Sequence, residues 1–113
     1  MELVLSRAYE LDGIVEYKPG SVITRSIIQK KTGHISVSSF DAGEMQVSKI
    51  SPFDHLVMVI DGVAEVIIDE TSTHLEKGEI MIIPAHATSK LKANKRFKVL
   101  SVLIKSGYED VEL

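Results

Sequence analysis

The sequence predicts an all-β fold, an antiparallel sandwich or barrel of the jelly-roll type. Three observations support this prediction: apolar residues recur with the two-residue period of strands, turn-forming or acidic residues close each apolar run, and no long helical pattern intervenes. Many short strands without helices between them are typical of antiparallel sandwiches and barrels. The expected strands cover residues 22–28, 35–40, 45–50, 55–60, 63–68, 71–75, 80–83, 89–91 and 97–104.

Helical spacing occurs only in the first eleven residues. There Val4, Ala8 and Leu11 would lie on one side of a helix before Asp12-Gly13 ends it. Because so short a helix is marginal without packing, we expect a short N-terminal helix or turn. Between the later strands, Asp61-Gly62 predicts a tight hairpin, since glycine adopts the positive φ that such turns require.

The composition favours one globular domain that covers residues 1–113. The chain has 113 residues of which 44% are hydrophobic, enough for one sizeable core. It contains no cysteine, which excludes disulfides and thiolate metal sites. A net charge of -3 gives no general attraction to nucleic acid or to an anionic membrane. No apolar run approaches the roughly 20 residues of a membrane helix, and Glu2 precedes any leader-like core, so we expect a cytoplasmic protein.

Two segments carry most of the remaining information, residues 43–62 and residues 78–93. Their glycine and proline spacings resemble the two motifs of the cupin family, G-x(5)-H-x-H-x(3,4)-E-x(6)-G and G-x(5)-P-x-G-x(2)-H-x(3)-N. The resemblance extends from about Tyr17 to Ile104 and implies a cupin barrel, a jelly roll that binds a metal through the motif side chains. This chain departs from the family at those positions: Lys49, Ser51 and His55 replace His, His and Glu, and His86, Ser89 and Ala93 replace Gly, His and Asn.

The departures disfavour a metal, and we predict neither a metal nor another cofactor. Serine hydroxyls are poor ligands, and an ammonium group at Lys49 would repel a cation. His55, with His86 moving in, would supply two imidazoles, fewer than the three donors of a typical catalytic site. An atypical metal-dependent oxygenase or isomerase that uses His55 and His86 therefore stays an alternative. The other alternative is a metal-free acid–base catalyst centred on His55, as in the related sugar epimerases.

The candidate pocket consists of Lys49, Ser51, His55 and Ser89, with His86 on a loop at its rim. The Lys49 ammonium would stand where the resemblance places the charge of the metal and would attract a small polar or anionic ligand. Two plainer interpretations stay open, in which Lys49 only reaches the solvent and His55 is an ordinary barrel residue. The preferred function is small-molecule binding, in a process that the sequence does not identify.

Strand alternation makes a further prediction about partners. If His55 points inward with Val57 and Val59, then Leu56, Met58 and Ile60 point outward. A strand that is apolar on both faces is usually covered on both, by a second sheet or another subunit, which predicts a homodimer.

The lysines of residues 90–98 could bind an acidic partner or nucleic acid. Aromatic residues that would stack on bases are few there, however, and edge strands often carry lysines to prevent aggregation. We therefore expect no nucleic-acid partner. We expect His34 and His74 to be plain surface residues.

Overall fold

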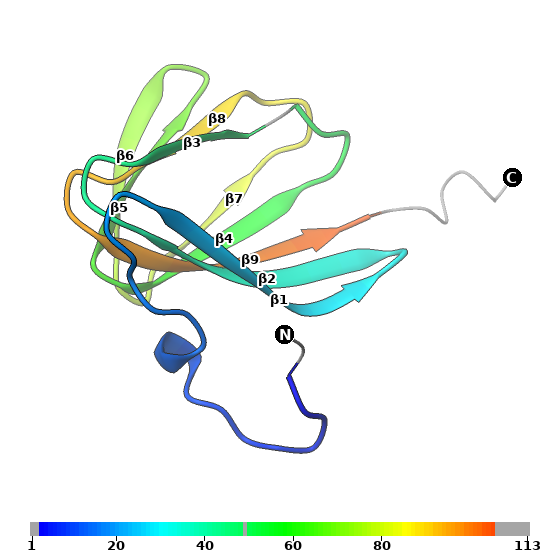
Figure 1. The fold of residues 1–113 in the computed structure, drawn as a ribbon. Coiled ribbons are helices and arrows are strands. Elements are labelled where there is room, and N and C mark those ends of the chain that lie inside the picture. Colours follow the sequence, from blue (N-terminus) through cyan, green and yellow to red (C-terminus); the bar gives the residue numbers. More distant parts are fainter. Residues whose placement is uncertain (1–2, 49, 106–113) are drawn as a thin grey trace, which may run out of the picture.

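The structure is a computed structural model that describes residues 3–48 and 50–105. All nine expected strands are present, so the all-β prediction is confirmed (Figure 1). They follow a single 3-10 turn at Leu11–Gly13. The strands are β1 (Val22–Lys30), β2 (Gly33–Phe40), β3 (Met45–Ser48), β4 (His55–Asp61), β5 (Val63–Ile68), β6 (Thr71–Glu76), β7 (Ile80–Ile83), β8 (Ser89–Lys92) and β9 (Phe97–Ile104).

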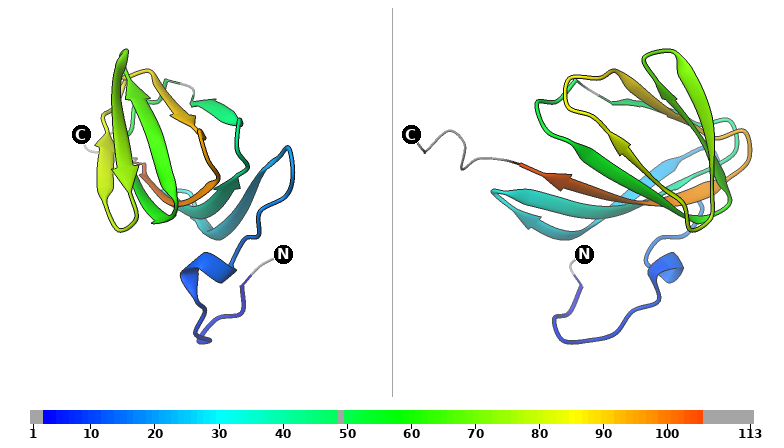
Figure 2. Two further views of the ribbon diagram at one scale, coloured as in Figure 1. Left: turned by 90° about the vertical axis from the view of Figure 1, so that its left-hand side faces the viewer. Right: turned by 180° about the vertical axis from the view of Figure 1, so that it is seen from behind.

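The strands form two antiparallel sheets that face each other (Figures 1 and 2). The large sheet has the order β1-β2-β9-β4-β7 and the small sheet the order β3-β8-β5-β6. Neighbours that are distant in sequence, such as β2 and β9, are paired along their whole length. This arrangement is the predicted jelly-roll barrel. Within the described residues, no helix is long and apolar enough to cross a membrane.

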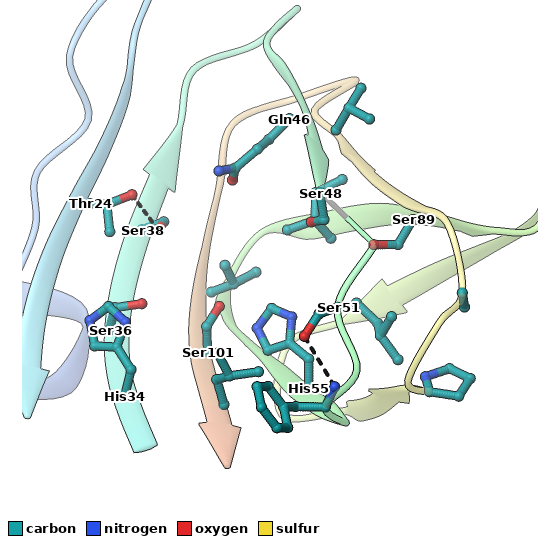
Figure 3. A pocket seen from close by; sticks show the side chains of 18 residues that line it. Thr24, His34, Ser36, Ser38, Gln46, Ser48, Ser51, His55, Ser89 and Ser101 are labelled. Carbon is teal, nitrogen blue, oxygen red and sulfur yellow. Dashed lines mark hydrogen bonds between the residues drawn. The ribbon is translucent and has the colours of Figure 1, made fainter. Parts of the chain in front are cut away.

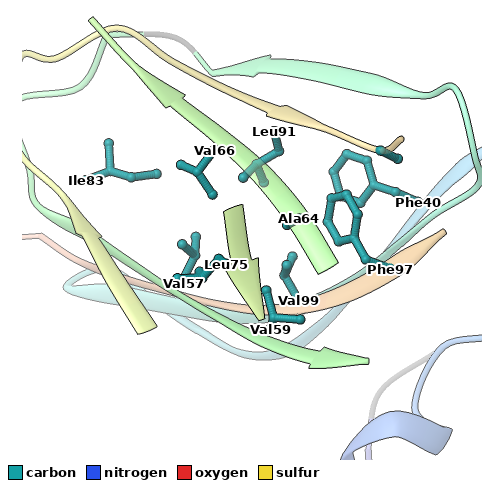
Figure 4. Packing of buried hydrophobic residues seen from close by; sticks show 11 residues of the cluster. Phe40, Val57, Val59, Ala64, Val66, Leu75, Ile83, Leu91, Phe97 and Val99 are labelled. Carbon is teal, nitrogen blue, oxygen red and sulfur yellow. The ribbon is translucent and has the colours of Figure 1, made fainter. Parts of the chain in front are cut away.

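The main core lies between the two sheets, where it extends from Ile83 to Phe40 and Phe97 (Figure 4). Its largest members are Phe40 and Phe97, both fully buried, whose rings stack with centroids 4.5 Å apart and planes 16° apart. Val57 and Val59 are also fully buried, which confirms the predicted inward face of β4. We call the end of the barrel that holds Phe40 and Phe97 the narrow end.

A second apolar cluster lies on the outer face of the large sheet. Residues 3–10 form no helix, and the expected N-terminal helix or turn is only the 3-10 turn. The segment that follows this turn buries Ile14 and Val15 against Val37 and Ile60 of the sheet. A helix of so few residues is marginal in water, in agreement with the irregular backbone of this segment. The chain itself thus covers part of the outward apolar face of β4.

The turn at Asp61-Gly62 differs from the prediction. Gly62 has the expected positive φ of 77°, but β4 and β5 belong to different sheets, so the turn links two sheets and is not a hairpin. A Cβ at Gly62 would lie 2.4 Å from the Arg96 carbonyl oxygen, which requires glycine here. A two-residue hairpin does occur at Asp69-Glu70 between β5 and β6, where both residues have positive φ. It lacks the glycine or asparagine that would have indicated such a turn.

Candidate functional site: the barrel cavity

A cavity of about 460 Å³ lies between the sheets at the end opposite Phe40 and Phe97 (Figure 3). We call this end the wide end. Seven hydroxyl groups, two imidazoles and one carboxamide face the cavity. They belong to Thr24, Ser36, Ser38, Ser48, Ser51, Ser89, Ser101, His34, His55 and Gln46.

Sheet register brings four of these hydroxyls together in two pairs. Ser36 of β2 lies directly opposite Ser101 of β9 in the large sheet. Ser48 of β3 lies directly opposite Ser89 of β8 in the small sheet. Residues opposite each other in an antiparallel pair have Cβ atoms about 4.5–5.5 Å apart on one face. The cavity therefore has one serine pair on each of its two walls.

His55 lies in the same cavity, at the start of β4 (Figure 3). Its side chain forms no hydrogen bond with any described residue, and it is half-buried. Burial lowers the pKa of the His55 imidazole below its usual value, so the ring is neutral at pH 7. A neutral imidazole has one donor and one acceptor nitrogen, both available to a ligand.

His34 corrects the expectation that it is a plain surface residue. It is half-buried and lines the cavity, and its Nε2 lies 2.9 Å from the Ser26 hydroxyl oxygen. His34 of β2 and His55 of β4 both lie opposite Leu103 of β9. The two histidines are therefore on the same face of the large sheet, separated by one strand. Alternation along β2 was the available signal: if Val37 faces outward, His34, Ser36 and Ser38 must face inward.

The other sequence-predicted residues have different positions. Ser51 and Ser89 line the cavity, and Ser89 is only 3% exposed. The Ser51 hydroxyl also accepts a hydrogen bond from the Phe53 amide at 3.1 Å. Lys49 lies outside the described residues. His86 is exposed and does not line the cavity, although its amide donates to the Ser51 carbonyl at 2.7 Å.

The backbone of His86 explains its place in the motif. His86 has a φ of 69°, in the left-handed region that favours glycine, and it occupies the position where the family pattern has glycine. The fold therefore keeps the turn that glycine makes in the family pattern. The His86 side chain makes this left-handed conformation energetically less favourable than it would be for glycine. Its exposure outside the cavity means that the motif alignment alone does not identify a ligand-binding role.

The residues present do not fit the metal site of the family pattern. Within residues 3–48 and 50–105, no three His, Asp or Glu side chains lie close enough together to hold an ion. His34 and His55 are separated by Leu103, and no described aspartate or glutamate lines the cavity. A three-donor site cannot be assembled from these groups.

A Tyr–Asp pair is present, but it is remote from the cavity. The Tyr17 hydroxyl donates to the Asp61 carboxylate at 2.6 Å. Asp61 ends β4, whereas His55 begins it, so the pair lies at the narrow end. Arg96 and Lys98 lie over the Tyr17 ring, 4.5 and 4.9 Å from its centroid. This cluster fastens the N-terminal segment to the barrel and does not supply the acid–base partners that His55 would need.

Comparison with known proteins gives one consistent result. No family model and no curated protein sequence matches the chain significantly. Among solved structures, a conserved protein of unknown function from Streptococcus pyogenes has a TM-score of 0.85 at 26% identity, over 91% of this chain and 90% of that one. A cupin superfamily protein from Desulfitobacterium hafniense has a TM-score of 0.85 at 24% identity, over 92% of this chain and 95% of that one.

A cupin 2 conserved barrel domain protein from Leptotrichia buccalis has a TM-score of 0.81 at 29% identity, over 86% of this chain and 47% of that one. These neighbours agree with the motif resemblance and with the two-sheet barrel described above. The chain therefore has the cupin fold, and the two neighbours from Desulfitobacterium hafniense and Leptotrichia buccalis are cupin proteins.

Proposed function

We propose that this chain is a single-domain cytoplasmic cupin, residues 1–113, that binds a small polar molecule in the barrel cavity without a metal. One observation carries the proposal: polar side chains converge on the cavity without hydrogen-bond partners among the described residues. They are the four paired serines, the His55 imidazole and the Gln46 carboxamide.

The position of these groups makes this observation informative. Ser89 is 3% exposed and Ser36 is 8% exposed, but among the described residues only Arg25 Nη2 is a fully buried side-chain polar atom without a partner, so the serine hydroxyls stay open to the cavity. Water in the cavity can hydrate them, and a ligand that replaces this water must reproduce its hydrogen bonds. A bound molecule with several hydrogen-bonding groups would satisfy this set. A cavity of about 460 Å³ lies within the range of small-ligand pockets.

Catalysis in the same cavity is the second candidate function. What favours it is the neutral, unpartnered imidazole of His55, which suits a general base. A metal-dependent version would also need His86 to enter the cavity. Metal analysis of protein purified without chelators separates these versions. Stoichiometric iron, manganese, nickel or zinc would contradict metal-free binding.

Fragment screening by amide NMR tests the binding proposal. We expect polar fragments to shift the resonances of cavity residues, and Ser101→Leu to weaken these shifts by removing one hydroxyl and narrowing the cavity. Ser72→Leu is the matched control, because Ser72 is an exposed strand serine outside the cavity. Fragments that shift only resonances elsewhere on the barrel would refute the proposal. Lys49→Met is included, since a loss of binding by anionic fragments alone would assign the Lys49 ammonium to the site.

We also propose that the protein forms a homodimer through the outer face of the large sheet. What supports this is an apolar row across all five strands: Ile28, Ile35, Val102, Leu56 and Ile82 lie opposite one another in register. Its two ends are 47% and 58% exposed at Ile28 and Ile82. The N-terminal segment packs on the neighbouring row, at Met58, and a second sheet from another copy would cover this one.

Sedimentation at micromolar concentration tests the homodimer. We expect a dimer that Ile82→Lys converts to monomer, because a buried lysine ammonium in a sheet-to-sheet contact is strongly unfavourable. Lys90→Ala, on the small sheet, should leave the dimer intact. A wild-type protein that is only monomeric under these conditions would overturn this proposal without affecting the cavity.

A further inference from the structure

We propose that the ligand of the cavity is an uncharged polyhydroxylated molecule, a sugar or polyol of about one ring, held between the two serine pairs. This inference rests on the proposed function of the same cavity. The ligand class inferred here is narrower than the one in the proposed function, because it excludes the anionic ligands that the sequence analysis left open.

The first step is the type of hydrogen bond that the cavity offers. Ser36 and Ser101 on the large sheet, and Ser48 and Ser89 on the small sheet, each provide one donor and two acceptor sites. A carboxylate or phosphate accepts hydrogen bonds only, so it would use the donors and leave the acceptors unmatched. A ligand hydroxyl both donates and accepts, which matches serine on either wall.

The second step separates these four hydroxyls from the other polar groups of the cavity. Thr24 and Ser38 already satisfy each other at 2.8 Å, and His34 is paired with Ser26. The unpartnered hydroxyls are therefore those of the two serine pairs, one pair on each wall of the cavity. Facing sheets lie about 10 Å apart, which leaves room for one ring between the serine pairs.

The third step is charge. Among the described lining residues there is no lysine, arginine, aspartate or glutamate, and His55 is neutral at pH 7. An anion that left water for this cavity would lose its hydration without gaining a described counter-charge. An uncharged ligand does not incur that cost.

The fourth step is the apolar part of the lining. Ile83, Leu91, Val99 and Phe53 line the cavity beside the serines. A sugar or polyol ring presents C–H groups on its faces and hydroxyls around its rim. The apolar side chains can pack against the C–H faces of the ring, and the serine pairs can form hydrogen bonds with the hydroxyls around its rim.

The experiment compares neutral compounds with charged counterparts by amide NMR titration. The probes are glucose and myo-inositol, against glucuronate and myo-inositol 1-phosphate. We expect at least one neutral probe to shift cavity resonances and to bind at least tenfold more tightly than its charged counterpart. The double variant Ser36→Ala/Ser101→Ala should weaken that binding at least tenfold. Ser72→Ala, outside the cavity, should change it less than twofold.

Three outcomes would overturn the inference. If the charged probes bind and the neutral ones do not, with binding lost in Lys49→Met, the ligand class is anionic and only the cavity proposal survives. If other fragments shift the cavity but none of the four probes does, the polyhydroxylated class is wrong. If no compound of any kind shifts the cavity, the proposed function fails together with this inference.

Discussion

The two ends of this barrel are built on the same strands, yet one is a packed core and the other a polar cavity. Along the inner face of β2, Phe40 at the narrow end gives way to Ser38 and Ser36 at the wide end. Along β4, buried Val59 and Val57 give way to His55. The pleat, the register and the sheet order are common to both ends.

The difference shows that residue type alone converts a core position into a site position. Large apolar side chains from two sheets interdigitate and exclude water, which stabilises the fold. Small polar side chains at equivalent inward positions leave space and unpaired hydrogen-bonding groups. The narrow end should therefore carry most of the stability, and the wide end should tolerate substitution at the expense of binding. The following predictions test that division, from the largest effect to the smallest.

Phe97→Ala should have the largest effect. Phe97 is fully buried and stacks on Phe40, so its loss should lower the free energy of unfolding by about 3–5 kcal/mol. Ser101→Ala, on the same face of the same strand at the wide end, should change it by less than about 1 kcal/mol. Urea denaturation measures both. Equal losses for the two variants would show that the ends do not divide stability in this way.

Gly62→Ala should have the next largest effect. It adds a Cβ that would meet the Arg96 carbonyl oxygen and imposes a side chain on a φ of 77°, so we expect a loss of about 2–4 kcal/mol. Gly78→Ala is the matched control, because its φ is 87° but no atom lies within 4 Å of the added Cβ. It should cost only about 1 kcal/mol. Thermal unfolding of the two variants distinguishes strain from steric clash, and similar losses would rule out the clash.

Tyr17→Phe should cost about 1 kcal/mol through loss of the hydrogen bond to Asp61. Burial and this hydrogen bond raise the pKa of the Tyr17 phenol above its usual value of 10.0. Because the folded state holds this proton more tightly, its stabilising effect is present below pH 10 and decreases as the pH rises above it. Urea denaturation at pH 8 and pH 10.5 should show a steeper alkaline loss in the wild type than in Tyr17→Phe. Parallel pH profiles would contradict this account of the phenol.

The smallest effect concerns His55 at the wide end. Because burial lowers the pKa of His55 in the folded state, the neutral ring is favoured there. The associated stability is present above a pH of about 6.5 and decreases as the pH falls below it. His55→Gln should remove this part of the acid dependence between pH 7.5 and pH 5.5. NMR titration of the His55 ring measures its pKa directly, and a value at or above 6.5 would contradict the prediction.

The sequence predicted the strands better than the connections between them. Period-two alternation is a local property of the chain, so it was sufficient to identify the nine strands and the inward face of β4. The hairpin predicted at Asp61-Gly62 was wrong, because a glycine with positive φ serves a hairpin and a crossover between sheets equally well. Only the pairing of β4 with β9 and β7, residues distant in sequence, distinguishes the two.

The candidate site shows the same limit. Motif alignment predicted Ser51, His55 and Ser89 at the cavity, and they line it. It also placed His86 on a loop at the rim, and His86 is exposed, does not line the cavity and has a left-handed backbone conformation. It missed the serine pair formed by Ser36 and Ser101, since neither lies in a motif. Two strands that are far apart along the chain must be paired before those hydroxyls can be recognised as neighbours.

By itself, the sequence determined the all-β class, the strand positions and the loss of the metal ligands, because each depends on residue type or on spacing within a few residues. Tertiary structure alone decided which strands are neighbours, which end of the barrel is packed and which polar groups share a cavity. Those outcomes depend on sheet register between residues far apart along the chain, and register is settled by the simultaneous burial of all the apolar side chains. The period-two strand pattern and the cupin-like glycine and proline spacings therefore predict the barrel, and the pairing of its strands makes the serine-lined cavity.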